Sequence, residues 1–430
     1  MSGLGLTVGF AGLTHLGIVS SAAAAAKGAV TIAFDSDAAL VARLAKGERP
    51  IHEPGLDELV LVNADRLAYT ADIRDLARCD LIYVCPDVPT DDQGASDLSG
   101  LRPLLDAVAQ AMRPEAVLVI LSQVPPGFTR VNAPAGRIVF CQVETLIFGL
   151  AVERAMKPER FIVGCADPAA PLPPALTTFL GAFGCPILPM RYESAELAKI
   201  SINMFLVSSV STTNTLAELC ERIGADWSEI APALKLDRRI GPYAYLAPGL
   251  GIAGGNLERD LATVQRLART HDTDAGVVGA WLANSRHRRD WVLDRLQEEV
   301  LARAPDSVLA WLGLAYKQDT KSIKNSPSLA LLAAVPSARI RAFDPAVAAD
   351  PAFHLRLEAA TDALDACLGA DALVIITPWA NFRALDPADI GARMRGRTVI
   401  DPWGILDVAA TRRAGLVHHV LGRAPLSDGS

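Results

Sequence analysis

The sequence predicts an α/β fold in which two doubly wound, parallel-sheet domains are joined by a long central helix and a helical connector. Short, nearly continuous apolar runs alternate with helical stretches in the first part of the chain, and the same rhythm returns near the C-terminus. Such runs are typical of strands buried on both faces, as in parallel sheets covered by helices. Between the two series lies a long helical period without proline or glycine.

The first series predicts the strands of an N-terminal domain spanning residues 1–190. Its apolar runs are residues 6–11, 29–34, 81–85, 116–121, 137–140 and 161–164. The segments between these runs have helical character, which favours repeated strand–helix–strand units. Residues 168–175 are rich in proline and predict a loop that closes the domain.

The middle of the chain, residues 191–300, predicts a helical domain. One helix is expected from about Ser194 to Arg222, with Gly224 as its C-terminal cap. A second helical block follows from Leu257 to about Arg303. Helical connectors of this kind often carry subunit contacts, so we expect a homodimer interface here.

The second series predicts a C-terminal domain spanning residues 301–430. Its apolar runs are residues 308–314, 338–343, 372–377 and 398–401. Because the alternation of strand and helix repeats that of the first domain, we expect a second parallel sheet.

Composition places the chain among packed globular proteins. Its 430 residues are 51% hydrophobic and 21% charged, and the formal net charge of -7 gives no basis for nucleic-acid binding. The seven cysteines are scattered, without the spacing of a metal site, so no metal is expected. The chain starts without a basic signal region, and no apolar run approaches the roughly 18 residues of a membrane span. We therefore expect a cytoplasmic protein with no membrane partner.

A glycine-containing loop follows the first predicted strand, and an acid, Asp35, follows the second. The loop consists of Gly12, Leu13, Thr14, His15, Leu16 and Gly17. In a Rossmann βαβ unit such glycines permit a sharp turn, the next helix points its N-terminus at a pyrophosphate, and the acid binds a ribose hydroxyl. This order indicates a Rossmann-like domain that binds NAD rather than NADP. Thr14 stands at the motif's middle glycine, and the alternative is a strand–turn–helix without a ligand.

Further motifs are spread along the chain. They are Gly47–Leu59, Ser122–Gly127, Glu144–Gly149, Glu196–Lys199 with Asn203, Asp237–Gly241, Pro248–Asp260, Gly313–Lys317 with Ser326 and Pro327, and Thr377, Trp379 and Phe382. Together they resemble the motifs of the UDP-glucose/GDP-mannose dehydrogenase family, in its order and at its spacing, and they cover essentially the whole sequence.

The resemblance implies an NAD-binding N-terminal domain, a central helix at a dimer interface, and a C-terminal Rossmann-like domain that holds a nucleotide-diphosphate sugar. Typical members oxidise a sugar alcohol to the carboxylate with two NAD and capture the intermediate aldehyde on a cysteine. Asn256 occupies the position of that cysteine in this sequence. An amide has no comparable nucleophilicity, so the covalent step has no thiolate there.

The resemblance also assigns catalytic roles. Lys199 and Asn203 lie four residues apart, so a helix presents them on one face, where the family uses them to stabilise the developing alkoxide. Without the family, a solvated helix face is the plainer interpretation of such a pair. Asp260 is implied to position a water or to tune Lys199. Glu144 is implied to border the pocket, with an ordinary surface acid as its alternative, and Asn256 completes the predicted catalytic set.

The remaining predicted contacts follow from the same motifs. On the cofactor side they add Cys85, Thr90, Gln123, Arg259 and Lys324 to the glycine loop and Asp35. On the substrate side they are Glu144, Thr145, Leu146, Lys199, Asn203, Arg239, Tyr245, Gly249, Gly254, Lys317 and Trp403, with Arg239 reaching the site of the partner subunit.

The sequence therefore predicts an NAD-dependent nucleotide-sugar dehydrogenase that performs a single two-electron oxidation and releases an aldehyde or ketone. One alternative is a catalytically silent relative that binds nucleotides or nucleotide sugars. Another is a four-electron 6-dehydrogenase that forms a uronate without a cysteine.

Overall fold

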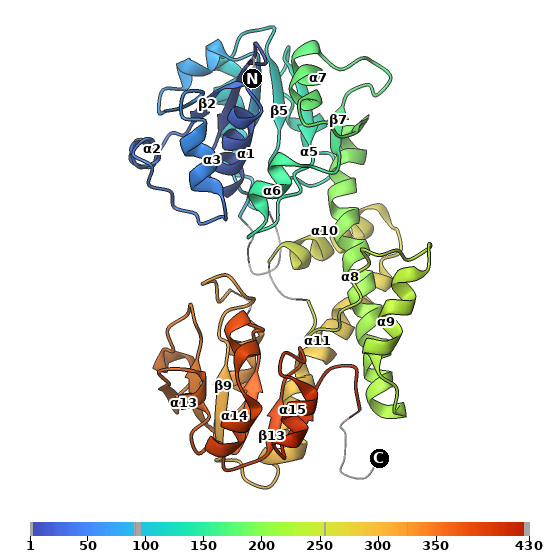
Figure 1. The fold of residues 1–430 in the computed structure, drawn as a ribbon. Helices are drawn as coiled ribbons and strands as arrows, with labels where there is room; N and C mark the ends of the chain where they lie inside the picture. The colour runs from blue at the N-terminus through green and yellow to red at the C-terminus, as the bar shows by residue number, and fades with distance from the viewer. Residues whose placement is uncertain (1–2, 90, 92–95, 253–254, 325, 425–430) are drawn as a thin grey trace. The chain divides into compact units, whose positions relative to one another are not determined.

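A computed structural model describes the chain except for residues 1–2, 90, 92–95, 253–254, 325 and 425–430. It contains two compact units, Met1–Ile202 and Asn203–Ser430. The boundary between them falls within one long helix, α8 (Tyr192–Ile223). Each unit has its own sheet (Figure 1).

The first unit contains an eight-stranded sheet in the order β3-β2-β1-β4-β5-β6-β7-β8. Its strands are β1 (Thr7–Ala11), β2 (Val30–Phe34), β3 (Leu67–Thr70), β4 (Leu81–Val84), β5 (Val117–Ile120), β6 (Ile138–Gln142), β7 (Phe161–Cys165) and β8 (Ile187–Arg191). Neighbouring strands are parallel except β6 and β7, which run antiparallel. The predicted parallel sheet is therefore present with one antiparallel pair, which the sequence could not show because an apolar run signals burial on both faces and carries no information on strand direction.

Helices cover both faces of this sheet, as the apolar strands require. They are α1 (His15–Ala26), α2 (Ala38–Ala45), α3 (Leu56–Val62), α4 (Leu101–Ala111), α5 (Phe128–Asn132), α6 (Ala151–Met156) and α7 (Pro174–Gly181). Alternate residues of one strand point to opposite cores: Leu81 and Tyr83 pack with α1 and α7, whereas Ile82 and Val84 pack with α4 and α5. The sheet order reverses between β1 and β4, and the crevice at such a reversal is where doubly wound sheets bind ligands.

The second unit contains a six-stranded, fully parallel sheet in the order β11-β10-β9-β12-β13-β14. Its strands are β9 (Val308–Leu312), β10 (Arg339–Phe343), β11 (Leu357–Ala359), β12 (Ala372–Ile375), β13 (Thr398–Ile400) and β14 (Val417–His419). Helices α11 (Gly276–Leu296) and α12 (Pro327–Ala334) pack on one face. Helices α13 (Ala363–Ala366) and α14 (Pro387–Arg393) pack on the other, and α15 (Val408–Arg413) contacts α14 and β14.

The described residues of the predicted helical middle are largely helical. Helix α8 ends at Ile223, and Gly224 follows it with a φ of +78°, the left-handed conformation expected of its cap. Helix α9 (Trp227–Leu236) comes next. The single block predicted from Leu257 to Arg303 is divided into α10 (Gly255–His271) and α11. Across the described residues, no helix is long and apolar enough to cross a membrane, and no group of three or more metal-binding side chains occurs.

Candidate active site

The predicted dinucleotide loop forms a tight turn between β1 and α1 that requires glycine at two positions. Gly12 has a φ of +97°, and a Cβ there would lie 2.8 Å from the backbone nitrogen of Pro86. A Cβ at Gly17 would lie 2.0 Å from the carbonyl oxygen of Gly12. Helix α1 therefore starts directly beside the turn, which is where dinucleotide-binding loops place a pyrophosphate next to helix N–H groups.

Asp35 lies next to this loop, directly after β2. The N–H of Leu13 donates to Asp35 Oδ2 at 2.7 Å, and the N–H of Asp37 donates to Oδ1 at 2.9 Å. The structure thus brings together the glycine turn, the start of α1 and the acid. This is the donor and acceptor set that a pyrophosphate and a ribose diol need.

Thr14 turns its side chain toward the segment after β4. Its hydroxyl oxygen accepts the N–H of Asp87 at 2.8 Å and lies 3.5 Å from the carbonyl oxygen of Cys85. The predicted Cys85 is fully buried, with its sulfur 3.4 Å from the carbonyl oxygen of Ala11, and burial raises the pKa of its thiol. Cys85 therefore packs as a neutral thiol against the backbone at the start of the glycine turn.

Asp87, which was not among the predicted site residues, lies at the N-terminus of α1. Its Oδ2 accepts the N–H of His15 at 3.2 Å. Burial raises the pKa of the Asp87 carboxyl, and hydrogen bonds from Thr14 and His15 act in the opposite direction. Its position two residues after Cys85 was the available signal. A carboxylate here competes with a pyrophosphate for the same N–H groups.

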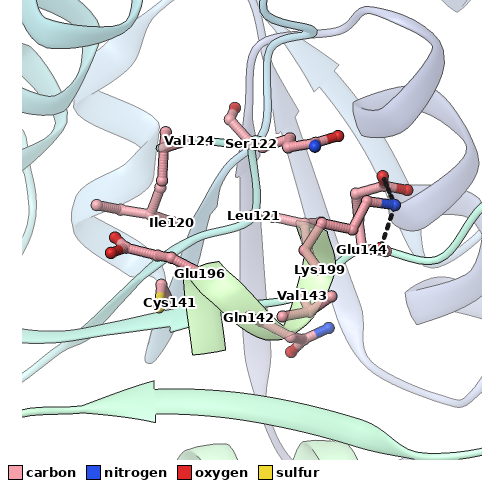
Figure 2. A pocket seen from close by; sticks show the side chains of 11 residues that line it. Ile120, Leu121, Ser122, Val124, Cys141, Gln142, Val143, Glu144, Glu196 and Lys199 are labelled. Atoms are coloured by element: carbon pink, nitrogen blue, oxygen red, sulfur yellow. Dashed lines mark hydrogen bonds and ion pairs between the residues drawn. The ribbon is translucent and has the colours of Figure 1, made fainter. Parts of the chain in front are cut away.

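Lys199 and Glu144 form an ion pair at the edge of a small cavity (Figure 2). The Lys199 Nζ lies 2.7 Å from Glu144 Oε1 and donates to the Glu144 carbonyl oxygen at 3.0 Å. Both side chains are largely buried, so the attraction is stronger than between surface charges. The cavity has a volume of about 20 Å³ and is lined by Ile120, Leu121, Ser122, Gln123, Val124, Cys141, Gln142, Val143, Glu144, Glu196 and Lys199.

Glu196 precedes Lys199 by one turn of α8 but points away from it in Figure 2. Its carboxylate accepts the N–H groups of Gly127 at 2.5 Å and Thr129 at 2.8 Å, at the start of α5. Burial raises the pKa of Glu196, which these hydrogen bonds oppose. Glu196 therefore holds the turn that carries the predicted Gln123 against α8.

Asn203 and Asp260 form a second pair, within the second unit. The Asn203 Nδ2 donates to Asp260 Oδ2 at 2.5 Å, and Arg259 Nε lies 3.3 Å from Asp260 Oδ1. Arg259 and Asp260 are buried at the start of α10. Lys199 and Asn203, the predicted pair, are both residues of α8, four positions apart in the chain.

The loop after β6 contains the predicted Thr145 and Leu146. The N–H of Leu146 donates to Glu144 Oε2 at 2.9 Å, and Arg154 Nε donates to the carbonyl oxygen of Thr145 at 2.6 Å. Arg154 belongs to α6, so this helix fixes the backbone on which the Glu144 carboxylate is presented.

In the second unit the structure brings Gly249 and Trp403 together. A Cβ on Gly249 would lie 3.6 Å from the Trp403 ring, and the Gly249 N–H donates to Asn214 Oδ1 at 2.8 Å. Trp403 Nε1 donates to the Ile376 carbonyl oxygen at 2.7 Å, so the indole offers a predicted ligand its ring and not its N–H.

The other predicted contacts have different surroundings. Arg239 is exposed and pairs with Asp237 on its own loop at 2.6 Å. The Tyr245 carbonyl oxygen accepts the Thr213 hydroxyl at 3.4 Å, and Lys317 Nζ lies 5.6 Å from the centre of the Tyr316 ring. Lys324 is exposed. Asn256 lies in the first turn of α10, and Thr90 and Gly254 lie outside the described residues.

Comparison with known protein families matches three consecutive segments to one family. Residues 6–171 match the NAD binding domain of the UDP-glucose/GDP-mannose dehydrogenase family, residues 193–285 its central domain, and residues 310–408 its UDP binding domain. The chain belongs to the UDP-glucose/GDP-mannose dehydrogenase family. The family predicted from the motifs is thereby confirmed.

Relatives of this family member match over nearly its whole length. UDP-glucose 6-dehydrogenase TuaD of Bacillus subtilis is 28% identical over 428 residues, covering 96% of this chain and 92% of the relative. UDP-glucose 6-dehydrogenase of Pseudomonas aeruginosa is 29% identical, covering 96% of each chain. The solved UDP-glucose dehydrogenase of Pyrobaculum islandicum has a TM-score of 0.83 at 25% identity, covering 97% of this chain and 98% of that one. UDP-D-ManNAc dehydrogenase of Pyrococcus horikoshii shares the fold, with a TM-score of 0.82 at 23% identity and 97% and 99% coverage.

This member of the UDP-glucose/GDP-mannose dehydrogenase family is an NAD-dependent oxidoreductase that acts on an alcohol of a nucleotide sugar. NAD is its cofactor, and the glycine turn, the N-terminus of α1 and Asp35 fit a dinucleotide. The fold class with two parallel-sheet α/β domains is confirmed as well.

Proposed function

We propose that this dehydrogenase removes two electrons from one alcohol carbon of a nucleotide-diphosphate sugar and releases an aldehyde or ketone. The observation that carries the proposal is the buried Lys199–Glu144 pair beside a cavity at the ends of β5 and β6. It stands together with an asparagine, Asn256, at the position where the family's motif has its cysteine.

In this reaction Lys199, Asn203 and Glu144 have separate roles. NAD supplies the hydride acceptor. An ammonium has three donors, so two bonds to Glu144 leave Lys199 one donor for the substrate oxygen, whose developing negative charge it stabilises. Asn203 adds a donor from the next turn, oriented by its bond to Asp260. Glu144 holds Lys199 in place and keeps its charge compensated in a buried site.

A second oxidation, from aldehyde to carboxylate, would need the cysteine nucleophile that this chain lacks at position 256. Capture of an aldehyde needs a thiolate, and an asparagine amide at position 256 does not provide one. An aldehyde product therefore leaves before a second hydride transfer, and a ketone product has no hydrogen on its carbonyl carbon for one. The proposed domains are residues 1–190, 191–300 and 301–430, and the last of these holds the nucleotide sugar.

The experiment supplies NAD and a panel of UDP- and GDP-sugars, and measures NADH formed per sugar together with product mass. We expect one NADH per sugar and a product two hydrogens lighter. Two NADH and a carboxylate would establish the four-electron alternative instead. Lys199→Met serves as the inactive control, and Asn256→Cys tests whether a thiol restores a second NADH.

A silent relative that binds a nucleotide sugar is a second candidate, favoured by one observation. The Asp87 carboxylate accepts an N–H group at the start of α1, where it would weaken the binding of an NAD pyrophosphate. This candidate would be supported if no sugar in the panel were turned over while calorimetry detected binding of a nucleotide sugar.

We further propose a homodimer formed along α8. Phe205, Leu216, Leu219 and Ile223 fall on one face of this helix, and all four are exposed in the single chain. An apolar stripe of this kind is typical of a subunit interface. Arg239, exposed on the loop after α9, is proposed to reach the partner's nucleotide-sugar site, where its guanidinium would bind a phosphate or sugar hydroxyl.

A further inference from the structure

A buried carboxylate outside the predicted site, Glu53, joins two loops of the first unit. It lies between α2 and α3, and only 1% of its side chain is exposed. Glu53 Oε1 lies 2.7 Å from His15 Nε2, in the first turn of α1. The same carboxylate accepts the N–H of Gly149 at 3.0 and 3.1 Å and the N–H of Ala151 at 3.3 Å.

A contact between two aromatic rings joins the same two loops. The His15 and Phe148 rings lie 4.2 Å apart between centroids, with an angle of 37° between their planes. Phe148 belongs to the loop that begins with Glu144, and Ala151 starts α6. We call His15, Glu53, Phe148, Gly149 and Ala151 the Glu53 junction. It joins the loop predicted to bind the dinucleotide to the segment that presents Glu144 to Lys199.

The chemistry of the Glu53 junction makes this connection stiff. A buried carboxylate is costly unless its oxygens are hydrogen-bonded, and here they are shared between a side chain of one loop and the backbone of another. If either the loop at His15 or the loop at residues 144–151 moved alone, the buried Glu53 carboxylate would lose hydrogen-bond donors. The two loops are therefore expected to shift together.

We propose that Glu53 is a positioning residue that couples occupancy of the dinucleotide loop to the placement of residues 144–151. An NAD pyrophosphate at the N-terminus of α1 fixes His15, His15 fixes the Glu53 carboxylate, and the carboxylate fixes Gly149 and Ala151. The coupling itself requires only NAD binding. Its consequence for catalysis, through Glu144, rests on the proposed function.

Hydrogen–deuterium exchange of the full chain, with and without saturating NAD, tests this coupling. In the wild type, NAD should slow exchange both in α1 and in a peptide covering residues 144–156, the latter by about fivefold. In Glu53→Gln and in His15→Phe, NAD should still protect α1 but should no longer protect residues 144–156. The His15→Phe change keeps a ring against Phe148 and removes the donor to Glu53.

Asp344→Asn is the matched control, because Asp344 is a buried acid that accepts the N–H groups of Leu314 and Ala315 in the second unit. It should leave the NAD effect on residues 144–156 unchanged. The proposal is overturned if NAD does not protect residues 144–156 in the wild type, or if a folded variant keeps that protection. Each variant tests the route through Glu53 by itself, so one variant decides if the other does not fold. No sugar is present, so a failure to turn over any nucleotide sugar leaves this result intact.

Discussion

Lys199 and Glu144 compensate each other's charge in a partly buried site, and this makes Lys199 the residue on which turnover should depend. We expect Lys199→Met to lower kcat about 100- to 10,000-fold, because the donor to the developing alkoxide is lost. NAD affinity should stay within about twofold of the wild type, since Lys199 is not part of the glycine loop. Steady-state kinetics with an active sugar, together with NAD titration by calorimetry, measures both.

Arg130 provides the comparison for that variant. It is a basic residue of the same unit that pairs with the exposed Glu193 outside the cavity. Arg130→Met should leave kcat near the wild-type value. A loss of activity as large as that of Lys199→Met would show that removing any paired cation has this effect, and would contradict the role assigned to Lys199.

Asp87 should weaken NAD binding, and its effect should depend on pH. Its pKa is raised chiefly by burial, so its proton is held to a higher pH than in an exposed aspartate. Below that pKa the carboxyl is neutral and tolerates a pyrophosphate, and above it the carboxylate repels one. NAD affinity should therefore rise as the pH falls through the Asp87 pKa. At neutral pH, Asp87→Asn should tighten NAD binding by about fivefold, or ~1 kcal/mol.

Calorimetric NAD titration between pH 4.5 and 8 checks this prediction, with Asp97→Asn as control. Asp97 follows the same strand but is exposed. Weaker binding in Asp87→Asn, or a pH dependence that persists in this variant, would count against a repulsive carboxylate.

At the scale of elements, the short helix α5 depends on Glu196 of α8. Glu196→Ala would leave the N–H groups of Gly127 and Thr129 without their acceptor, and we expect a loss of about 1–3 kcal/mol in the free energy of unfolding. Chemical denaturation monitored by circular dichroism measures the change. The control is Glu193→Ala, which removes another acid of α8. Because the partner of Glu193 is the exposed Arg130, this change should lower the free energy of unfolding by less than about 1 kcal/mol.

The elements that sequence patterns predicted well are those buried on both faces. Central strands such as β4 and β5 are fully buried and match apolar runs in the sequence. The edge strands β3, β8, β11 and β14 were not identified. β8 includes exposed positions and a proline, and β11 has only three residues. Edge strands are ordered by pairing with a neighbour, which local hydrophobicity does not record.

At the scale of the whole molecule, the exposed stripe on α8 predicts the oligomeric state. Leu219→Asp should place a charge in the proposed interface and shift the mass measured by light scattering from a dimer toward the 45.5 kDa monomer. Leu355→Asp changes a leucine that is 96% exposed on the second unit and should leave the mass unchanged. A wild-type protein that is already monomeric would contradict the proposed interface.

The candidate site was predictable as far as its motifs are local in sequence. Gly12, Gly17 and Asp35 follow strands at fixed spacings, and the structure brings them together as expected. Asp87 follows Cys85 by two residues and Glu53 lies in the matched segment Gly47–Leu59, but the roles of these two acids could not be inferred in this way. Each acts through a contact with a residue far away in the chain, His15 in both cases, and no spacing rule connects them.

The sequence by itself determined the α/β architecture, the family and the cofactor, because these follow from periodicity and from motifs whose residues are close in the chain. Only the tertiary structure decided which groups compete for the N-terminus of α1, which carboxylate joins the dinucleotide loop to residues 144–151, and that β6 and β7 run antiparallel. Those features depend on the direction and packing of segments separated by many residues. The energies of their contacts exist only once the chain has folded.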